Sequence, residues 1–264
     1  MAQRVRFDRP PVVEVVCGVL FGALPKLRTA HVGLFWSLLR DDFPTVDEAP
    51  PLVPVIETQE ASLLEGSILE LAAPLPRSWF RTNDGHELIQ LQRDRFIYNW
   101  KRESPEDGPY PSYDIVIVEF ERRWGQFGAF VTQEDLGELV PRQFELIYVN
   151  IIPEDCIPPD DSVLVDHART ASHARFLPEP ESFNWQTSYP LPERNGRLHV
   201  AASSARQWAT GKPGIRLDMT ARGINNEPTA GMREWFDLAH EWIVNGFADV
   251  TTARMQQNVW RRQQ

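Results

Sequence analysis

A nearly unbroken apolar run near the start of the chain constrains the fold more than any other stretch. Residues 10–21 read PPVVEVVCGVLF, with prolines before the run and Gly22 and Pro25 after it. A strand that is apolar on both faces is normally a central strand, covered above and below. We therefore predict a central strand over residues 11–22 that carries a single charge, Glu14.

The same pattern returns in the second half of the chain. Pro10-x-x-Val13-Glu14-Val15-Val16 is echoed by Pro141-x-x-Phe144-Glu145-Leu146-Ile147, which opens an apolar run to Ile152. The echo predicts two strand/helix units, 1–135 and 136–264, that share one continuous sheet.

The segments between these runs predict an α+β protein with an antiparallel sheet and helices on one face. A helix is expected first, over residues 27–43, with an apolar stripe that contains Leu27, Ala30, Leu34 and Leu38 and extends to Phe35. Asp84-Gly85 is a hairpin turn. The further expected elements are an edge strand at 53–57, a three-stranded meander at 78–102, a helix at 113–130, strands at 183–189, 197–206 and 215–222, and a closing helix at 231–260 broken near 246. The irregular segment 153–182 is where the second unit departs most from the first. At the level of element order the chain resembles duplicated TATA-binding-protein-like or helix-grip arrangements, a likeness that carries no function.

Composition excludes several classes of protein. The 264 residues carry a net charge of −10, which disfavours a protein whose main partner is nucleic acid. The chain shows neither a signal peptide nor an apolar run of membrane-spanning length, so we expect a cytoplasmic protein without a membrane partner. It lacks phosphate-binding glycine loops and the G-x-S-x-G elbow, and we predict no cofactor.

Two carboxylates are the candidate catalytic residues. Glu14 and Glu145 each lie near the start of an apolar strand, and on neighbouring strands they would approach each other. Paired carboxylates shift each other's pKa and can divide the roles of acid and base. The alternative is that each carboxylate bonds a backbone amide or an arginine at the polar end of the sheet.

Other chemistry-bearing residues have simpler interpretations. The cluster in segment 153–182 fits no metal-ligand spacing, and we predict no metal site there. A Cys17–His31 pair and His240 are more simply core residues. The cluster consists of Asp155, Cys156, Asp160, Asp161, His167 and His173.

Aromatic and basic residues suggest a binding surface. Of the nine tryptophans, Trp208 and Trp260 are expected to be exposed, and exposed tryptophans anchor interfaces. Arg216 and Arg222 alternate with apolar residues on one strand, so they would lie on a polar sheet face. With Arg197, His199 and Arg206 nearby, that face is an alternative site for nucleic acid.

Three stretches together carry a resemblance to a known family. They are Pro10–Val16, the strand Phe96–Trp100 that leads to Tyr110-Pro111-Ser112-Tyr113, and Tyr148–Ile152. The pattern is similar to a sporadically distributed family of uncharacterised bacterial proteins of similar length. The resemblance implies no activity or catalytic residue, and sporadic distribution is typical of defence or mobile-element modules.

The sequence thus favours a non-catalytic interaction or sensor module that binds a protein or small-ligand partner, with the partner encoded nearby and the oligomeric state open. An enzyme using Glu14 and Glu145 is the alternative, and a nucleic-acid binder with a local basic sheet face is the second alternative.

Overall fold

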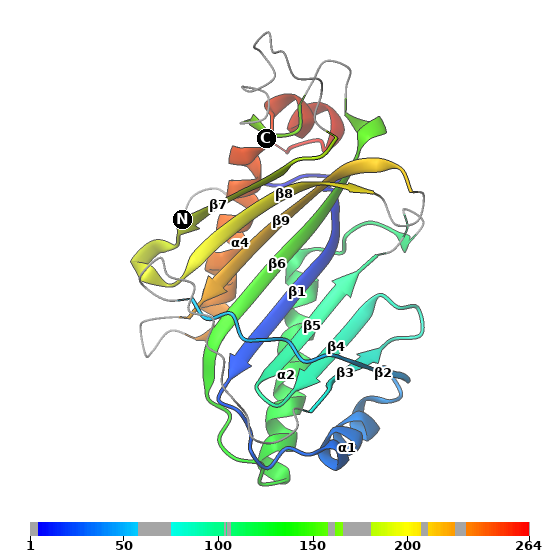
Figure 1. Ribbon diagram of the computed structural model, residues 1–264, viewed down its shortest axis with the longest axis vertical. Coiled ribbons are helices and arrows are strands. Elements are labelled where there is room, and N and C mark those ends of the chain that lie inside the picture. The colour runs from blue at the N-terminus through cyan, green and yellow to red at the C-terminus, as the bar shows by residue number, and fades with distance from the viewer. Residues whose placement is uncertain are drawn as a thin grey trace.

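The architecture is one open antiparallel sheet of nine strands. The computed structural model describes residues 5–57, 75–102, 104, 107–157, 162–165, 181–206, 211–224 and 231–263. The strand order is β2-β3-β4-β5-β1-β6-β9-β8-β7 (Figure 1). The strands are β1 (Val12–Phe21), β2 (Thr45–Ala49), β3 (Arg77–Arg81), β4 (Glu87–Gln92), β5 (Arg95–Lys101), β6 (Pro141–Pro153), β7 (Asn184–Pro190), β8 (Arg197–Arg206) and β9 (Pro213–Gly223).

The two apolar runs form the centre of the sheet, as predicted. β1 and β6 pair with each other over most of their length, with Val16 opposite Ile147 and Gly18 opposite Glu145. On the outer side of β1 lie β5, β4, β3 and finally β2, and on the outer side of β6 lie β9, β8 and β7. After each of these two central strands the chain goes to an edge of the sheet and returns inward strand by strand, so that β5 pairs with β1 and β9 pairs with β6.

The helices cover one face of this sheet (Figure 1). They are α1 (Thr29–Leu39), α2 (Tyr113–Gln133) and α4 (Met232–Val250). Because side chains alternate along a strand, Val15, Cys17 and Val19 of β1 all point to the helical side, and all are fully buried. There they join the aromatic core, in which Phe120 of α2 packs 5.1 Å from Phe236 of α4.

Helix α1 uses a different face from the one expected. Leu34 and Leu38 are 50% and 62% exposed, whereas Phe35 and Leu39 are buried. Phe35 packs against α2, with its ring 5.3 Å from that of Phe127. Of the predicted stripe, Leu27 and Phe35 are buried, whereas Leu34 and Leu38 are exposed, so the buried side of the helix is shifted by one position from the one expected.

An extended segment, residues 50–57, crosses the face of the sheet opposite the helices, and we call it the strap (Figure 1). The edge strand that we expected at 53–57 lies earlier, at β2. Two buried glutamines hold the strap by imitating a strand's backbone. Gln92 accepts from the Leu52 amide at 3.0 Å and donates to the Leu52 carbonyl at 3.1 Å. Gln143 accepts from the Glu57 amide and donates to the Val55 carbonyl, both at 2.8 Å.

The end of the strap is fixed by a carboxylate. Glu57, whose side chain is 8% exposed, accepts from Arg197 Nη1 at 2.8 Å and bonds His199 Nε2. Burial opposes ionisation of Glu57, but the hydrogen bonds from His199 and Arg197 outweigh it and hold its pKa below its ordinary value. The strap therefore reaches from β4 across the centre of the sheet to β8.

The two ends of the described chain meet beside α4. Residues 5–9 form an arm along the C-terminal segment. The Arg9 amide donates to the Trp260 carbonyl at 3.1 Å, and the backbones of Phe7 and Arg262 form an isolated antiparallel β-bridge. The closing helix runs unbroken through Gly246 and ends at Val250, so the break expected near 246 lies further on. A π-helical turn, Met255–Val259, then returns the chain to the arm.

Candidate functional site

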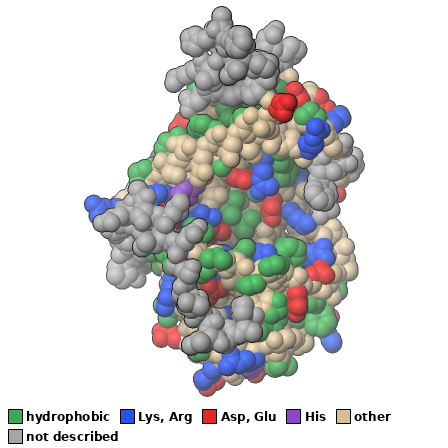
Figure 2. Space-filling view, in the orientation of Figure 1, with side chains coloured by type: hydrophobic (Ala, Val, Ile, Leu, Met, Phe, Trp, Pro, Cys, Tyr) green, Lys and Arg blue, Asp and Glu red, His purple; other side chains and the backbone are tan. Residues whose placement is uncertain are grey.

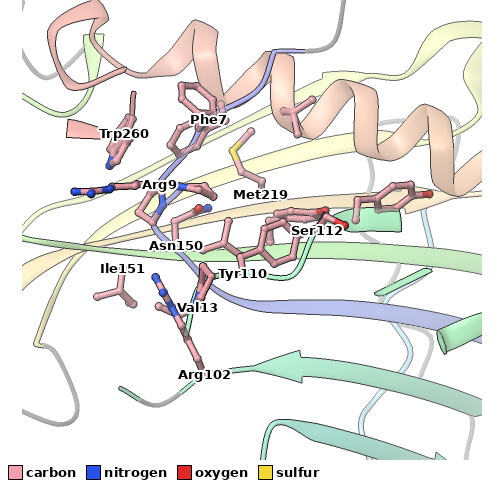
Figure 3. Close-up of a pocket in the computed structure, with 18 of the residues that line it drawn as sticks. Phe7, Arg9, Val13, Arg102, Tyr110, Ser112, Asn150, Ile151, Met219 and Trp260 are labelled. Carbon is pink, nitrogen blue, oxygen red and sulfur yellow. Dashed lines mark hydrogen bonds between the residues drawn. The ribbon is translucent and has the colours of Figure 1, made fainter. Parts of the chain in front are cut away.

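A large pocket lies between the sheet, α4 and the two chain ends. Its volume is about 1520 Å³. β1, β6 and β9 form its floor, and α4, the arm and the loop before α2 form its sides (Figure 3). Pockets that bind drug-sized ligands have volumes of roughly 300–1000 Å³, so this space is ample for such a ligand.

The walls of the pocket are mainly apolar and aromatic. Phe7 of the arm packs edge-on against Phe247 of α4 and against Trp260, with ring centroids 5.4 and 6.2 Å apart. Met219 of β9 and Ile243 of α4 add aliphatic surface from opposite sides. Burying apolar ligand surface here is worth about 25 cal/mol per Å².

Two tyrosines place a polar group in this apolar surrounding. The hydroxyls of Tyr110, in the loop before α2, and Tyr148, on β6, lie 2.8 Å apart. Burial raises the pKa of both phenols well above the ordinary value, so both remain neutral. Asn150, two residues along β6, donates from Nδ2 to the Leu217 carbonyl at 2.9 Å. The site thus offers neutral hydrogen-bonding groups rather than a titrating pair.

The side of the pocket at α2 is rigidly connected to α4. The Tyr113 hydroxyl donates to Asp237 at 2.9 Å, and the His240 ring stacks on Tyr113 at 3.9 Å. Ser112, which precedes α2 and lines the pocket, has φ of +127° and ψ of 160°. Residues other than glycine rarely adopt this backbone conformation, which costs about 1–3 kcal/mol of strain. Such strained residues are concentrated at functional positions.

Cationic side chains lie around the mouth of the pocket. Arg102 follows β5, and its guanidinium points past Val13 toward the side of Ile151 (Figure 3). Nη1 donates to the Gly108 carbonyl at 3.2 Å. Arg9 lies on the arm and is exposed.

The two candidate catalytic carboxylates are not brought together. Both lie on the face opposite the helices, but Glu14 pairs with Val149 and Glu145 with Gly18, four residues apart along the strands. This is a separation of about 13 Å. Glu14 accepts from Asn99 at 2.6 Å, and Glu145 forms an ion pair with Arg222. Glu145 thus bonds an arginine, as the alternative expected, Glu14 bonds a side-chain amide instead, and the two carboxylates do not form a dyad.

The proposed basic face is neutralised by ion pairs. Arg216 pairs with Asp218 at 2.8 Å, and the partners of Arg222 and Arg197 are Glu145 and Glu57. Figure 2 shows this side of the molecule, where acidic and basic side chains are interspersed. Hence these arginines do not form the continuous basic stripe that nucleic-acid binding would need.

The tryptophan anchors need correction. Trp260 was expected to be exposed, but it is only 3% exposed. The π-helical turn folds it back onto Phe7 and Phe247, so it forms a wall of the pocket instead of an outer surface. Trp208 lies outside the described residues.

Among the remaining candidates, those that the structure describes show no sign of reactivity. Burial raises the pKa of Cys17, and His31 accepts the Arg28 amide at the start of α1. Asp155 pairs with Lys212 at 2.8 Å. The described residues contain no group of three or more His, Cys, Asp or Glu placed to hold a metal ion. The other four members of the cluster, Asp160, Asp161, His167 and His173, lie outside the described residues.

The pocket itself was missed by the sequence analysis. Tyr110, Ser112, Tyr113 and Tyr148 all belong to the stretches that carry the family resemblance, but nothing in their spacing shows that they converge. The signal available was the polar and aromatic character of Tyr110-Pro111-Ser112-Tyr113 directly before a helix.

The fold and site define an α+β protein with an open antiparallel sheet and a pocket under its closing helix. Comparison with models of known protein families gives no match, and no curated protein is similar to the chain. Within the described part of the chain, the helices are too short or too polar to span a membrane.

Proposed function

We propose that this protein is a non-catalytic sensor module that binds a small, largely apolar ligand in the pocket beneath α4. The observation that carries the proposal is the pocket: about 1520 Å³ of space with aromatic and aliphatic walls and a few convergent polar groups. Sites of this composition are the usual ligand sites of proteins.

The polar groups inside the pocket support binding rather than turnover. Tyr110 and Tyr148 bond each other, and Tyr113 bonds Asp237. The hydroxyls of Tyr110 and Tyr148 are neutral and bond each other, so they can orient a ligand, whereas general acid–base catalysis favours a group with a pKa near the working pH.

The test is titration with a neutral aromatic probe, N-phenyl-1-naphthylamine, whose fluorescence rises in apolar surroundings. We expect saturable binding of one probe per protein. Val244→Trp should weaken it severalfold, because Val244 of α4 lines the pocket and a tryptophan there would take up part of the space beneath the helix. Val118→Trp is the matched control, since Val118 is 58% exposed on α2 and does not line the pocket. Equal binding by both variants would reject the pocket as the site.

A protein partner is the second candidate, and its support comes from α1. Leu34 and Leu38, one turn apart, expose large apolar side chains on its outer surface. Such a pair is a typical contact for a partner. Affinity capture from the native host should recover a partner with the wild type and lose it with Leu34→Glu/Leu38→Glu. Recovery of the same proteins by both would reject this surface.

We also propose that residues 1–135 and 136–264 are copies of one unit. The support is that each half contributes a central strand, then strands added inward from the edge of the sheet, four in the first half and three in the second, then a long helix. An experimental structure in which the halves do not superpose strand for strand would contradict the duplication.

A further inference from the structure

We infer that the ligand of the pocket is an organic anion with an apolar body, whose charged group binds at the mouth beside Arg102 and Arg9. The inference rests on the proposed function and adds the chemical class of the ligand. It depends on the charge around the mouth, the state of Arg102 and the depth of the apolar space behind it.

The lining of the pocket reverses the charge balance of the chain. Among the described lining residues the cations are Arg6, Arg9, Lys101 and Arg102, and the carboxylates are Asp8 and Asp114. The whole chain carries a charge of −10. A local excess of cations at a concave site in an acidic protein raises the local concentration of anions.

The two carboxylates leave this excess in place. Asp8 accepts from the side chain of Gln263 at 2.7 Å, and Asp114 lies in the first turn of α2. There the positive end of the helix dipole offsets its charge.

Arg102 is only partly compensated by the protein. Burial lowers its pKa, and the charge of Asp107 opposes this effect in part. Its guanidinium has five N–H donors, and one of its nitrogens, Nη1, bonds the Gly108 carbonyl. A carboxylate, sulfonate or phosphate that accepts from the remaining donors would restore the interaction that partial burial removes.

The space behind Arg102 suits the apolar body. Besides Arg102 and Val13, the pocket is lined by Met219 under α4 and by Trp260 at the chain end (Figure 3). A ligand with its charge at Arg102 therefore places the rest of its length against aromatic and aliphatic walls. A ligand with charged groups along its whole length would lose their hydration against these apolar walls without compensating hydrogen bonds.

The test compares two probes with the same aromatic body. N-phenyl-1-naphthylamine is neutral, and 1-anilinonaphthalene-8-sulfonate adds one sulfonate to the same rings. We expect the sulfonate probe to bind the wild type about tenfold more tightly. Arg102→Gln should remove about tenfold from the affinity for the sulfonate and leave that for the neutral probe unchanged. Arg9→Gln, at an exposed position, should act in the same direction and cannot fail through misfolding of the core.

The controls separate the two proposals. Arg40→Gln, an exposed arginine at the end of α1 outside the pocket, should change neither affinity. Equal affinities of the wild type for both probes, or equal losses in the Arg40 and Arg102 variants, would overturn the anion inference while the proposed function stands. Failure of both probes to bind would overturn both.

Discussion

Replacing Gln92 by Ala should release the first half of the strap without unfolding the sheet. The Gln92 side chain makes two hydrogen bonds to the backbone of Leu52. A net contribution of about 1 kcal/mol for each bond gives a loss of about 2 kcal/mol in the free energy of unfolding. For a chain of this size that corresponds to a fall in Tm of about 4–8 °C.

The assay is hydrogen exchange of the strap amides, read together with the thermal transition. In the wild type the Leu52 amide should be protected, because it donates to Gln92. In Gln92→Ala it should exchange at the rate of an exposed loop, while the amides of β1 stay protected.

A matched control lies two residues away on the same strand and face. Gln90 is also buried, but its side-chain amide donates to Asn99 at 2.7 Å instead of bonding the backbone of the strap. Gln90→Ala should therefore lower stability and leave Leu52 protected. If Leu52 is equally protected in the wild type and Gln92→Ala, side-chain amides do not hold the strap.

Three further predictions concern the sheet and its turns. Val15→Asp should lower the free energy of unfolding, measured by urea denaturation, by about 3–5 kcal/mol, because Val15 is fully buried under the helices. Leu38→Asp, at a position 62% exposed, should change it by no more than about 0.5 kcal/mol. Similar losses in the two variants would contradict the assignment of buried faces. The pKa of Glu57 is held below its ordinary value of 4.5 in the folded state. Its contribution to the protection of the strap amides from hydrogen exchange should therefore be complete above pH 4.5 and lost as the pH falls through the lowered pKa. Glu57→Gln should remove this pH dependence. Gly196→Ala should lower the free energy of unfolding by about 3 kcal/mol or more, since φ is +129° and a Cβ would lie 1.9 Å from the Arg222 carbonyl oxygen. Gly85→Ala, with φ of +74° and open space around it, should cost only about 1–2 kcal/mol in the same assay.

The sequence was sufficient to predict the elements whose signal is local. The central positions of β1 and β6 follow from apolar residues at both even and odd positions. The meander at 78–102 follows from a turn at Asp84-Gly85 between alternating strands. In both cases the physical cause lies within about ten consecutive residues.

Relations between distant residues could not be predicted in this way. Glu14 and Glu145 occupy equal places in two similar strands, but antiparallel neighbours start at opposite ends, so equal places do not face each other. In α1 the run Leu34-Phe35-Trp36 is apolar on several sides, and only the aromatic cluster at α2 decides which side is buried.

The strap and the pocket depend on contacts that no local pattern encodes. Gln92 and Gln143 look like ordinary strand residues until the strap lies over them. The pocket forms where the arm, β6, α4 and the chain end meet. Trp260, beside two arginines near the end of the chain, reads as an exposed residue because its partners Phe7 and Phe247 are distant in the sequence.

The most direct measurement of the central claim is a crystal structure of the protein soaked with N-phenyl-1-naphthylamine. We predict electron density for one probe beneath α4, in contact with Met219 on the floor and Trp260 at the side. Density for the probe only at other surfaces, or a pocket closed by the protein's own side chains, would contradict the account.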